Sequence, residues 1–241
     1  MRERSITGSS KTPPNPGPAE RQLGDAGNAF AGGDSRLCFV DPLDPGWCIK
    51  ILRPDRTPAR KRREQSWLKR LKPLQRFDDN LQDIRVYRWL ERSIGEAAYR
   101  LVPRIDGMVP TNLGPGLRSE LIRDDDGNIS LTLQTYLSRS GLDASLQTAL
   151  ADFNRDWQAL GMPSRRLLLH NIVVQQRAQR PIRLVVVDSL GWGDLIPAGY
   201  WVAPWARHRA RRKLRYLAAL IEAQARKQGP RTFPYCRNPA K

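Results

Sequence analysis

Short apolar runs dominate the chain between residues 29 and 128, and glycine, proline or aspartate bounds most of them. Alternating and β-branched patterns of this length are typical of half-buried strands. The pattern therefore predicts a small antiparallel sheet at the start of the folded part. Strands are expected over residues 37–40, 47–52 and 117–122, with a strand and a turn over residues 99–109.

Helical spacing begins after residue 60. Apolar residues three and four positions apart, from Leu81 to Ile94, form the stripe of an amphipathic helix. Pro73 is expected to divide this stretch into a basic arm and a helix that begins near Asp79. Further helices are expected over residues 132–137, 143–160 and 206–228.

Two short strands, over residues 167–174 and 183–188, interrupt the helical part, and residues 175–181 are expected to join them as a hairpin-like connection. The order of elements predicts an α+β fold with a small antiparallel N-lobe sheet and a mainly helical C-lobe. The expected organisation is a disordered tail rich in proline, glycine and serine (1–28), one domain (29–228, with lobes meeting near residue 128) and a basic tail (229–241).

Composition excludes several classes of protein. Of the 241 residues, 40% are hydrophobic, and no apolar run approaches the ~20 residues that span a bilayer. The N-terminus lacks the apolar segment of a secretory signal. The three cysteines lack CxxC spacing, which argues against a disulfide framework or a zinc site. These features predict a cytoplasmic protein that does not cross a membrane.

The net charge of +17 is distributed unevenly. Residues 204–241 contain eleven lysines and arginines and one acidic residue, and residues 60–63 form a second basic cluster. Such charge attracts phosphates, as found in nucleic acids, anionic lipids and nucleotides. The alternative is a solvated basic surface without a specific partner.

Three polar residues lie where strands could present them for chemistry. Lys50 lies between Ile49 and Ile51, so it faces either solvent or a cleft where it could bind phosphate. Asp188 follows an apolar run, where it either caps a turn or binds Mg²⁺. Asn171 precedes another apolar run and has the same two alternatives.

These residues follow one another in a particular order. A glycine turn comes first, then the strand lysine, an acid-bearing helix, the asparagine and finally a strand that ends in Asp-x-x-Gly. This order resembles the protein kinase fold, in which the lysine holds phosphates and the asparagine and aspartate hold metal ions. His170 has no acidic partner at catalytic spacing and is interpreted as structural or exposed.

The resemblance can be narrowed to the YrbL family, which is linked to the PhoP regulatory network of enteric bacteria and is similar in pattern to protein kinases. It covers roughly residues 29–220. The stretches that carry it are residues 36–42 with 48–50, 111–117 with 124–127, 171–174, and 187–191 with 195–197.

The resemblance implies a two-lobed, protein kinase-like fold that binds ATP and Mg²⁺. Asp83 lies in the helix where kinases place a glutamate that pairs with the lysine. Residue by residue, the resemblance implies nucleotide-binding roles for Gly32, Gly33, Lys50 and Asp83, and metal-binding roles for Asn171 and Asp188.

One departure bears on mechanism. A kinase has its catalytic base five positions before the asparagine, and Arg166 occupies that position here. Because an arginine does not accept a proton at neutral pH, we expect a catalytically weak protein or a pseudokinase in bacterial signalling. One alternative is an active phosphotransferase that acts on a small molecule or on a protein partner, with residues 124–126 or Asp194 as substitute acids. The other is a module that binds nucleic acid or anionic lipid through the basic C-terminal helix.

Overall fold

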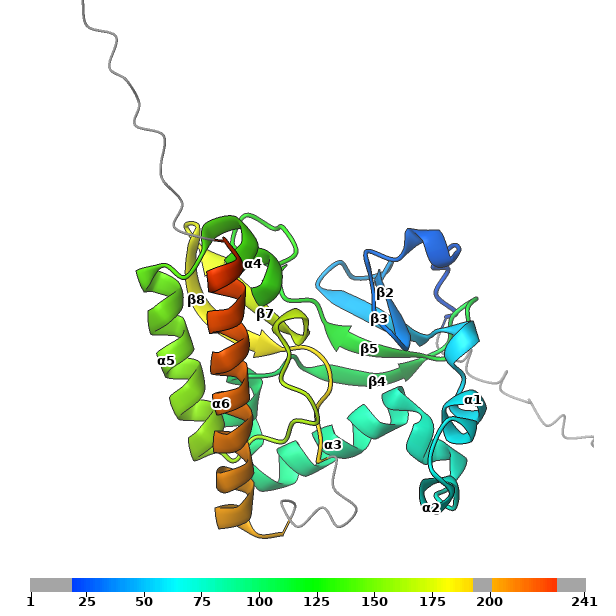
Figure 1. The fold of residues 1–241 in the computed structure, drawn as a ribbon. Coiled ribbons are helices and arrows are strands. Elements are labelled where there is room, and N and C mark those ends of the chain that lie inside the picture. Colours follow the sequence, from blue (N-terminus) through cyan, green and yellow to red (C-terminus); the bar gives the residue numbers. More distant parts are fainter. Residues whose placement is uncertain (1–18, 193–200, 229–241) are drawn as a thin grey trace, which may run out of the picture.

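The alternating patterns near the N-terminus form one antiparallel sheet in a computed structural model that describes residues 19–192 and 201–228 (Figure 1). Its strand order is β1-β2-β3-β5-β4, so the consecutive strands β1 to β3 are joined by hairpins. The strands are β1 (Ala31–Gly32), β2 (Arg36–Val40), β3 (Trp47–Leu52), β4 (Ile105–Val109) and β5 (Gly116–Glu120).

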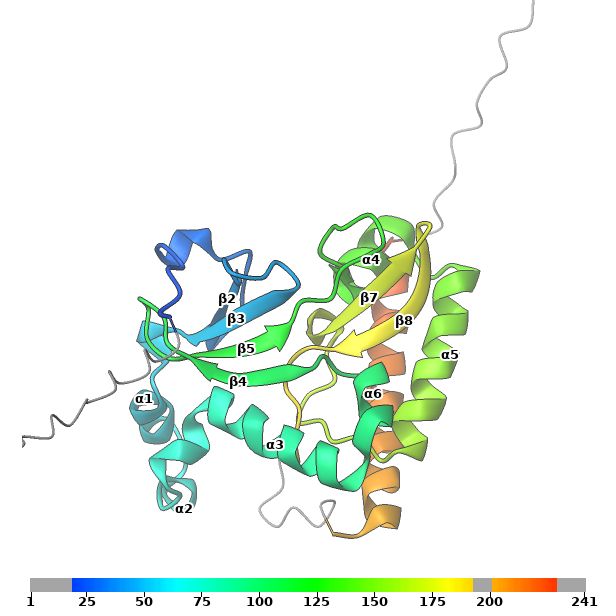
Figure 2. The same cartoon turned by 180° about the vertical axis from the view of Figure 1, so that it is seen from behind.

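The two faces of this first sheet differ in character. On one face, Phe39 and Ile49 pack with Leu23, which comes from the segment before β1. Because side chains alternate along a strand, Arg36 and Lys50 lie on the other face. That second face is turned toward helix α3 (Asp79–Ser93), which runs beneath the sheet (Figure 2).

The basic stretch after β3 is broken into short helices before α3 begins. Thr57 caps α1 with its side chain, and Asp78 caps α3 in the same way. The sequence interpretation of a basic arm followed by a helix near Asp79 is confirmed. The short elements are η2 (Pro54–Arg56), α1 (Pro58–Arg63), α2 (Trp67–Arg70) and η3 (Leu74–Phe77).

The C-terminal part combines a three-stranded antiparallel sheet with three helices. The sheet order is β6-β7-β8, and α4, α5 and α6 cover it (Figure 1). Asp143 caps α5 by accepting the Leu146 N–H. The elements are β6 (Leu131–Thr132), α4 (Leu133–Ser140), α5 (Ala144–Ala159), η5 (Leu169–Asn171), β7 (Ile172–Arg177), β8 (Arg180–Val186) and α6 (Ala203–Gln228).

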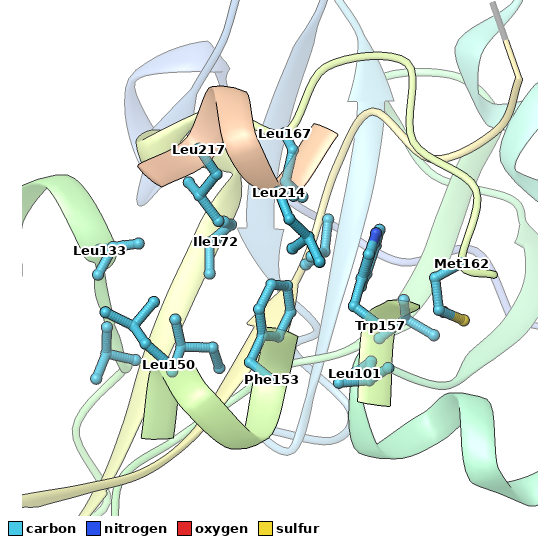
Figure 3. Packing of buried hydrophobic residues seen from close by; sticks show 14 of the residues in the cluster. Leu101, Leu133, Leu150, Phe153, Trp157, Met162, Leu167, Ile172, Leu214 and Leu217 are labelled. Atoms are coloured by element: carbon cyan, nitrogen blue, oxygen red, sulfur yellow. The ribbon is translucent and has the colours of Figure 1, made fainter. Parts of the chain in front are cut away.

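The main hydrophobic core lies in this C-terminal part (Figure 3). Phe153 and Trp157 of α5 stack with their ring centroids 5.2 Å apart. Leu214 and Leu217 of α6 and Ile172 of β7 also belong to this core. The core fixes the start of β7 and the end of β8, and the candidate site residues Asn171 and Asp188 lie just outside these two strand ends.

The predicted α+β class, with an antiparallel N-terminal sheet and a helical C-terminal region, is confirmed. Two local predictions are wrong. The strand expected from residue 99 does not begin until Ile105, because Tyr99 and Arg100 end the 3-10 helix η4 (Gly95–Arg100), and the strand expected from residue 167 begins only at Ile172. The connection expected over residues 175–181 is shorter, because β7 and β8 continue to a tight turn at Ala178 and Gln179.

The predicted tails fall largely outside the described residues, which exclude 1–18 and 229–241. Within residues 19–28, the backbone of Arg21 forms an isolated β-bridge with Thr111, and the side chain of Leu23 is buried. No helix in the described ranges is long and apolar enough to cross a membrane.

Candidate functional site

Lys50 lies at the centre of the face that the first sheet turns toward α3. Its backbone pairs with Cys38 on one side and Leu117 on the other. The residue is only 7% exposed, and its Nζ donates to the carbonyl of Val187 at 2.7 Å. Of the two sequence interpretations, the solvent-facing lysine is therefore wrong, because the ammonium group reaches from β3 to the segment after β8.

Asp188 lies two residues beyond the end of β8. The next residue, Ser189, has a φ of 62°, a left-handed conformation that is costly for residues other than glycine. The Asp188 carboxylate accepts the Ser189 N–H and binds Nη2 of Arg36 at 2.5 Å. The side chain is 41% exposed, so one side of the carboxylate stays accessible.

The same guanidinium binds a second acid. Nη1 of Arg36 lies 2.5 Å from Oδ2 of Asp83 on α3, and both side chains are almost fully buried. Asn80, one turn earlier, accepts from Nη1 at 3.3 Å and donates to the carbonyl of Lys50 at 2.9 Å. Arg36 therefore ties the sheet, α3 and the segment after β8 together at one point.

The electrostatics of this cluster keep its charges in place. Burial alone would raise the pKa of Asp188, but Arg36 and then Lys50 hold it below its usual range. Burial would lower the pKa of Arg36, yet Asp83 and Asp188 hold it well above its usual value. The guanidinium and the Asp188 carboxylate are therefore both charged at neutral pH.

Asn171 lies beside Asp188 in the fold, although 17 positions separate them in the sequence. The Val187 N–H donates to the Asn171 carbonyl at 2.9 Å, so the two segments run together. The Asn171 amide donates to the carbonyl of Arg166 at 3.4 Å. The residue is 8% exposed, and Arg166 and His170 are exposed.

Gly32 ends β1, and Gly33 begins the turn that precedes Arg36. The Gly33 N–H donates to the Arg36 carbonyl at 2.9 Å, and the Ser35 hydroxyl binds Asp79 of α3 at 2.6 Å. Both glycines are exposed. Their contribution here is a turn that begins β2 and sets Arg36 on the sheet.

The structure thus brings Lys50, Asp83, Asn171 and Asp188 together, and it adds Arg36, which the sequence interpretation missed. We call these five residues the Arg36 site. The position of Arg36 on the strand could have indicated this role. Side chains two residues apart on a strand lie on the same face, and Arg36 lies two residues before Cys38, the cross-strand partner of Lys50. The pairing of Asp83 differs from what the resemblance implies, since Asp83 binds Arg36 rather than Lys50.

The donor set of the Arg36 site fits a magnesium–nucleotide complex better than a bare metal ion. The described ranges contain no group of three or more histidine, cysteine, aspartate or glutamate residues that could hold a metal. Mg²⁺, however, is usually held by one or two side chains together with substrate phosphates. Asn171 and Asp188 could supply those two ligands, and Oδ1 of Asp83 is buried without a hydrogen-bond partner among the described residues.

The acids considered as substitute bases have other roles. The Asp124 carboxylate accepts from Ser130 and from both the backbone and side chain of Gln176, at the far end of β7 from Asn171. Asp125 accepts the Ala178 N–H. These contacts fasten a loop to the β7–β8 hairpin, and Asp194 lies outside the described residues.

Two cysteines share the face of the sheet that carries Lys50. Burial raises the pKa of Cys48 to about 11 and also raises that of Cys38, although Lys50 lowers both. Both therefore stay thiols at neutral pH, which does not suit a nucleophile.

The basic face of α6 is partly committed to structural contacts. Lys213 donates to the carbonyl of Arg165 at 2.5 Å, and Arg207 to that of Ala159 at 3.2 Å. Arg211 and Arg212 are exposed, whereas Arg209 is half-buried. Fewer charges of this helix are available to a partner than its sequence indicates.

Comparison with known proteins identifies the family. The family model described as "PhoP regulatory network protein YrbL" matches residues 23–222. The chain is 27% identical over 187 residues to "Uncharacterized protein YrbL" of Escherichia coli (strain K12), an alignment that covers 76% of this chain and 79% of that protein. The relative of the same name in Shigella flexneri matches with the same identity and coverage. The chain therefore belongs to the YrbL family of PhoP regulatory network proteins.

Proposed function

We propose that this chain is a kinase-like protein that binds ATP and Mg²⁺ at the Arg36 site and has weak or no phosphotransfer activity. The observation that carries the proposal is the meeting of Lys50 and Asp188. These residues are 138 positions apart, yet the Lys50 ammonium bonds to the residue directly before Asp188 at 2.7 Å. A buried cation beside a half-exposed carboxylate suits a phosphate group bridged by Mg²⁺.

Each residue has a role in this proposal. Lys50 binds phosphate oxygens, while Asn171 and Asp188 supply oxygen ligands to Mg²⁺. The Arg36 guanidinium occupies one oxygen of Asp188, so binding of Mg²⁺ at this carboxylate would have to compete with that ion pair. Asp83, whose Oδ1 has no hydrogen-bond partner among the described residues, could then accept from the Lys50 ammonium.

The expectation of weak catalysis rests on Arg166. An exposed arginine occupies the position of the base. Asp124 and Asp125 are bonded to the β7–β8 hairpin, and Asp126 is bonded to Asn128 in its own turn. Phosphoryl transfer depends mostly on positioning and charge, so slow turnover is compatible with a missing base. A protein that binds nucleotide and turns it over slowly is suited to a regulatory role. Such a role agrees with the family description.

A thermal-shift titration with ATP and Mg²⁺ tests the proposal. Ligand at 100 times its dissociation constant stabilises the folded state by about 2.7 kcal/mol. For a domain of this size, 1 kcal/mol corresponds to roughly 2–4 °C in the unfolding midpoint. We expect wild type to shift by several degrees, and Lys50→Ala and Asp188→Ala to shift much less, each relative to its own ligand-free midpoint.

Asp126→Ala is the matched control, because Asp126 is an exposed turn acid bonded to Asn128. It should retain the wild-type shift. If wild type shows no shift, or if all three variants shift as wild type does, the Arg36 site does not bind nucleotide.

A further inference from the structure

A second feature of the molecule lies along α3, on the face beside the one that carries Asp83 into the Arg36 site. It is a groove of about 850 Å³, large for a small-molecule pocket. Helices α1 and α2 and the turn η3 form one wall, and α3 and the segment around Trp192 form the other. We call it the basic groove. Its lining includes Lys61, Lys69, Lys72, Arg76, Arg85, Arg92 and Arg165.

Most of these cations are not paired with an acid. Asp79 is the acid among the described lining residues, and Lys61 binds it at 2.5 Å while Arg165 approaches it to 3.6 Å. The Ser35 hydroxyl also binds Asp79, and the Lys61 contact helps hold the pKa of its carboxyl below the usual range although burial would raise it. The acid is therefore already neutralised by its neighbours.

Five cations stay available to a partner: Lys69, Lys72, Arg76, Arg85 and Arg92. Among the described residues, none of them is within ion-pair distance of a carboxylate. Arg85 and Arg92 lie on α3 seven residues apart, so they mark out about 10 Å along one face of the helix. The groove thus offers a row of positive charge rather than one point.

Aromatic side chains line the same groove. Trp89 lies on α3 between Arg85 and Arg92, and Phe77, the last residue of η3, also lines the groove. Trp201 is 73% exposed, and Trp192 is buried at the groove wall. The exposed ring of Trp201, beside cations that form no ion pair with a described acid, is a surface on which a base of a single strand can stack while the phosphates are neutralised.

The geometry points to a binding site for single-stranded nucleic acid in the basic groove. A flat anionic membrane does not fit a concave site, and a duplex does not present unstacked bases to aromatic side chains. The groove is formed mainly by α1, α2, η3 and α3, and Arg165 and the segment around Trp192 complete its wall. None of the five residues of the Arg36 site lines it, so the inference does not depend on nucleotide binding there. It also differs from binding through α6, which uses another surface.

Fluorescence anisotropy with a labelled oligo(U) 12-mer tests this inference on the full chain. The variant Arg76→Ala/Arg85→Ala/Arg92→Ala removes three groove charges at exposed positions. The matched control, Arg211→Ala/Arg212→Ala/Arg215→Ala, removes three exposed charges from α6. We expect the groove variant to bind at least tenfold more weakly and the α6 variant to stay within threefold of wild type.

Salt dependence gives a second readout. Each phosphate contact on a single strand contributes about 0.7 to the slope of log K against log salt, so the groove variant should lose about 2 from that slope. Equal losses in the two triple variants, or no binding by wild type at 0.1 M salt, would overturn the inference.

Stacking is tested separately from charge. Trp201 and Trp67 are similarly exposed, at 73% and 71%, but only Trp201 lines the groove. Trp201→Ala should weaken oligo(U) binding several-fold, whereas Trp67→Ala should not. If Trp201→Ala binds as wild type does and inorganic polyphosphate competes as well as oligo(U), the groove recognises charge alone and the assignment to nucleic acid is wrong.

Discussion

Replacing Arg36 by methionine is expected to lower the free energy of unfolding by about 3–5 kcal/mol. The guanidinium is 3% exposed and binds Asp83, whose side chain is 5% exposed. Methionine keeps most of the volume but leaves the Asp83 carboxylate buried without its cation. Asp188 contributes less to this loss, because its side chain is 41% exposed and water can solvate it. Urea unfolding followed by far-UV circular dichroism measures the change.

Two further variants show whether the buried pair is the cause. Arg53→Met removes an exposed ion pair with Asp55 near the end of the same sheet, and it should leave the unfolding midpoint unchanged. Arg36→Met/Asp83→Leu should recover part of the stability, because neither charge is then left alone. If Arg53→Met costs as much as Arg36→Met, burial of the Arg36 pair is not the source of the effect.

The same substitution should change how stability depends on pH. The pKa of Asp188 is lower in the folded state than in the unfolded chain, where a value of about 3.9 applies. A carboxyl with a lowered pKa stabilises the fold above the unfolded value, and this contribution is lost as pH falls through the folded value. Wild type should therefore lose stability below about pH 4, and Arg36→Met should lose less.

Replacing Gly116 by alanine is expected to lower the free energy of unfolding by about 1–3 kcal/mol. An added Cβ at Gly116 would collide with Cγ2 of Ile49 and would lie 2.6 Å from Cδ1 of Ile51. Both isoleucines are buried in the small core of the first sheet, so neither can move freely. Since they flank Lys50 on β3, a shift of this strand would also weaken nucleotide binding at the Arg36 site.

Gly33→Ala is the control, measured by the same urea unfolding. An added Cβ at Gly33 meets no atom within 4 Å. The substitution should therefore change stability by no more than about 0.5 kcal/mol. A Gly33→Ala loss as large as that of Gly116→Ala would mean that strand propensity, rather than the collision with the isoleucines, governs both sites.

The sequence is informative where local patterns decide the structure. The strand expected over residues 47–52 is β3 itself, and the helix expected over residues 143–160 is α5 to within one residue at each end. Alternation around Lys50 and the cap at Asp143 suffice for this. Prediction failed over residues 99–103, because this segment connects α3 to the sheet instead of joining it: Tyr99 and Arg100 belong to the 3-10 helix η4, and β4 begins only at Ile105.

The candidate site was predictable only in part. Lys50, Asn171 and Asp188 are flanked by apolar runs that mark them as strand-borne polar groups. Arg36 also adjoins an apolar run, residues 37–40, but its role depends on two long-range contacts, to Asp83 and Asp188, that are 47 and 152 positions away. The basic groove was equally hidden, since its cations come from four separate elements and a single segment shows only ordinary basic composition.

Helix α3 connects the two features. Its buried face carries Asn80 and Asp83 into the Arg36 site, while Arg85 and Arg92 face the basic groove. Asp79, at the start of the helix, is bonded to Ser35 of the turn before Arg36 and to Lys61 of the groove. An anion that draws Lys61 away from Asp79 would act on the same helix that positions Asp83.

The most direct measurement of the central claim is calorimetric titration of ATP into the protein with and without Mg²⁺. The account predicts that Mg²⁺ raises the affinity of wild type at least tenfold. In Asp188→Asn, which keeps the shape of the side chain and removes its charge, that Mg²⁺ dependence should be lost while weak binding through Lys50 persists. Equal dependence on Mg²⁺ in the two proteins, or no measurable binding by wild type, would contradict a magnesium–nucleotide site at Asp188.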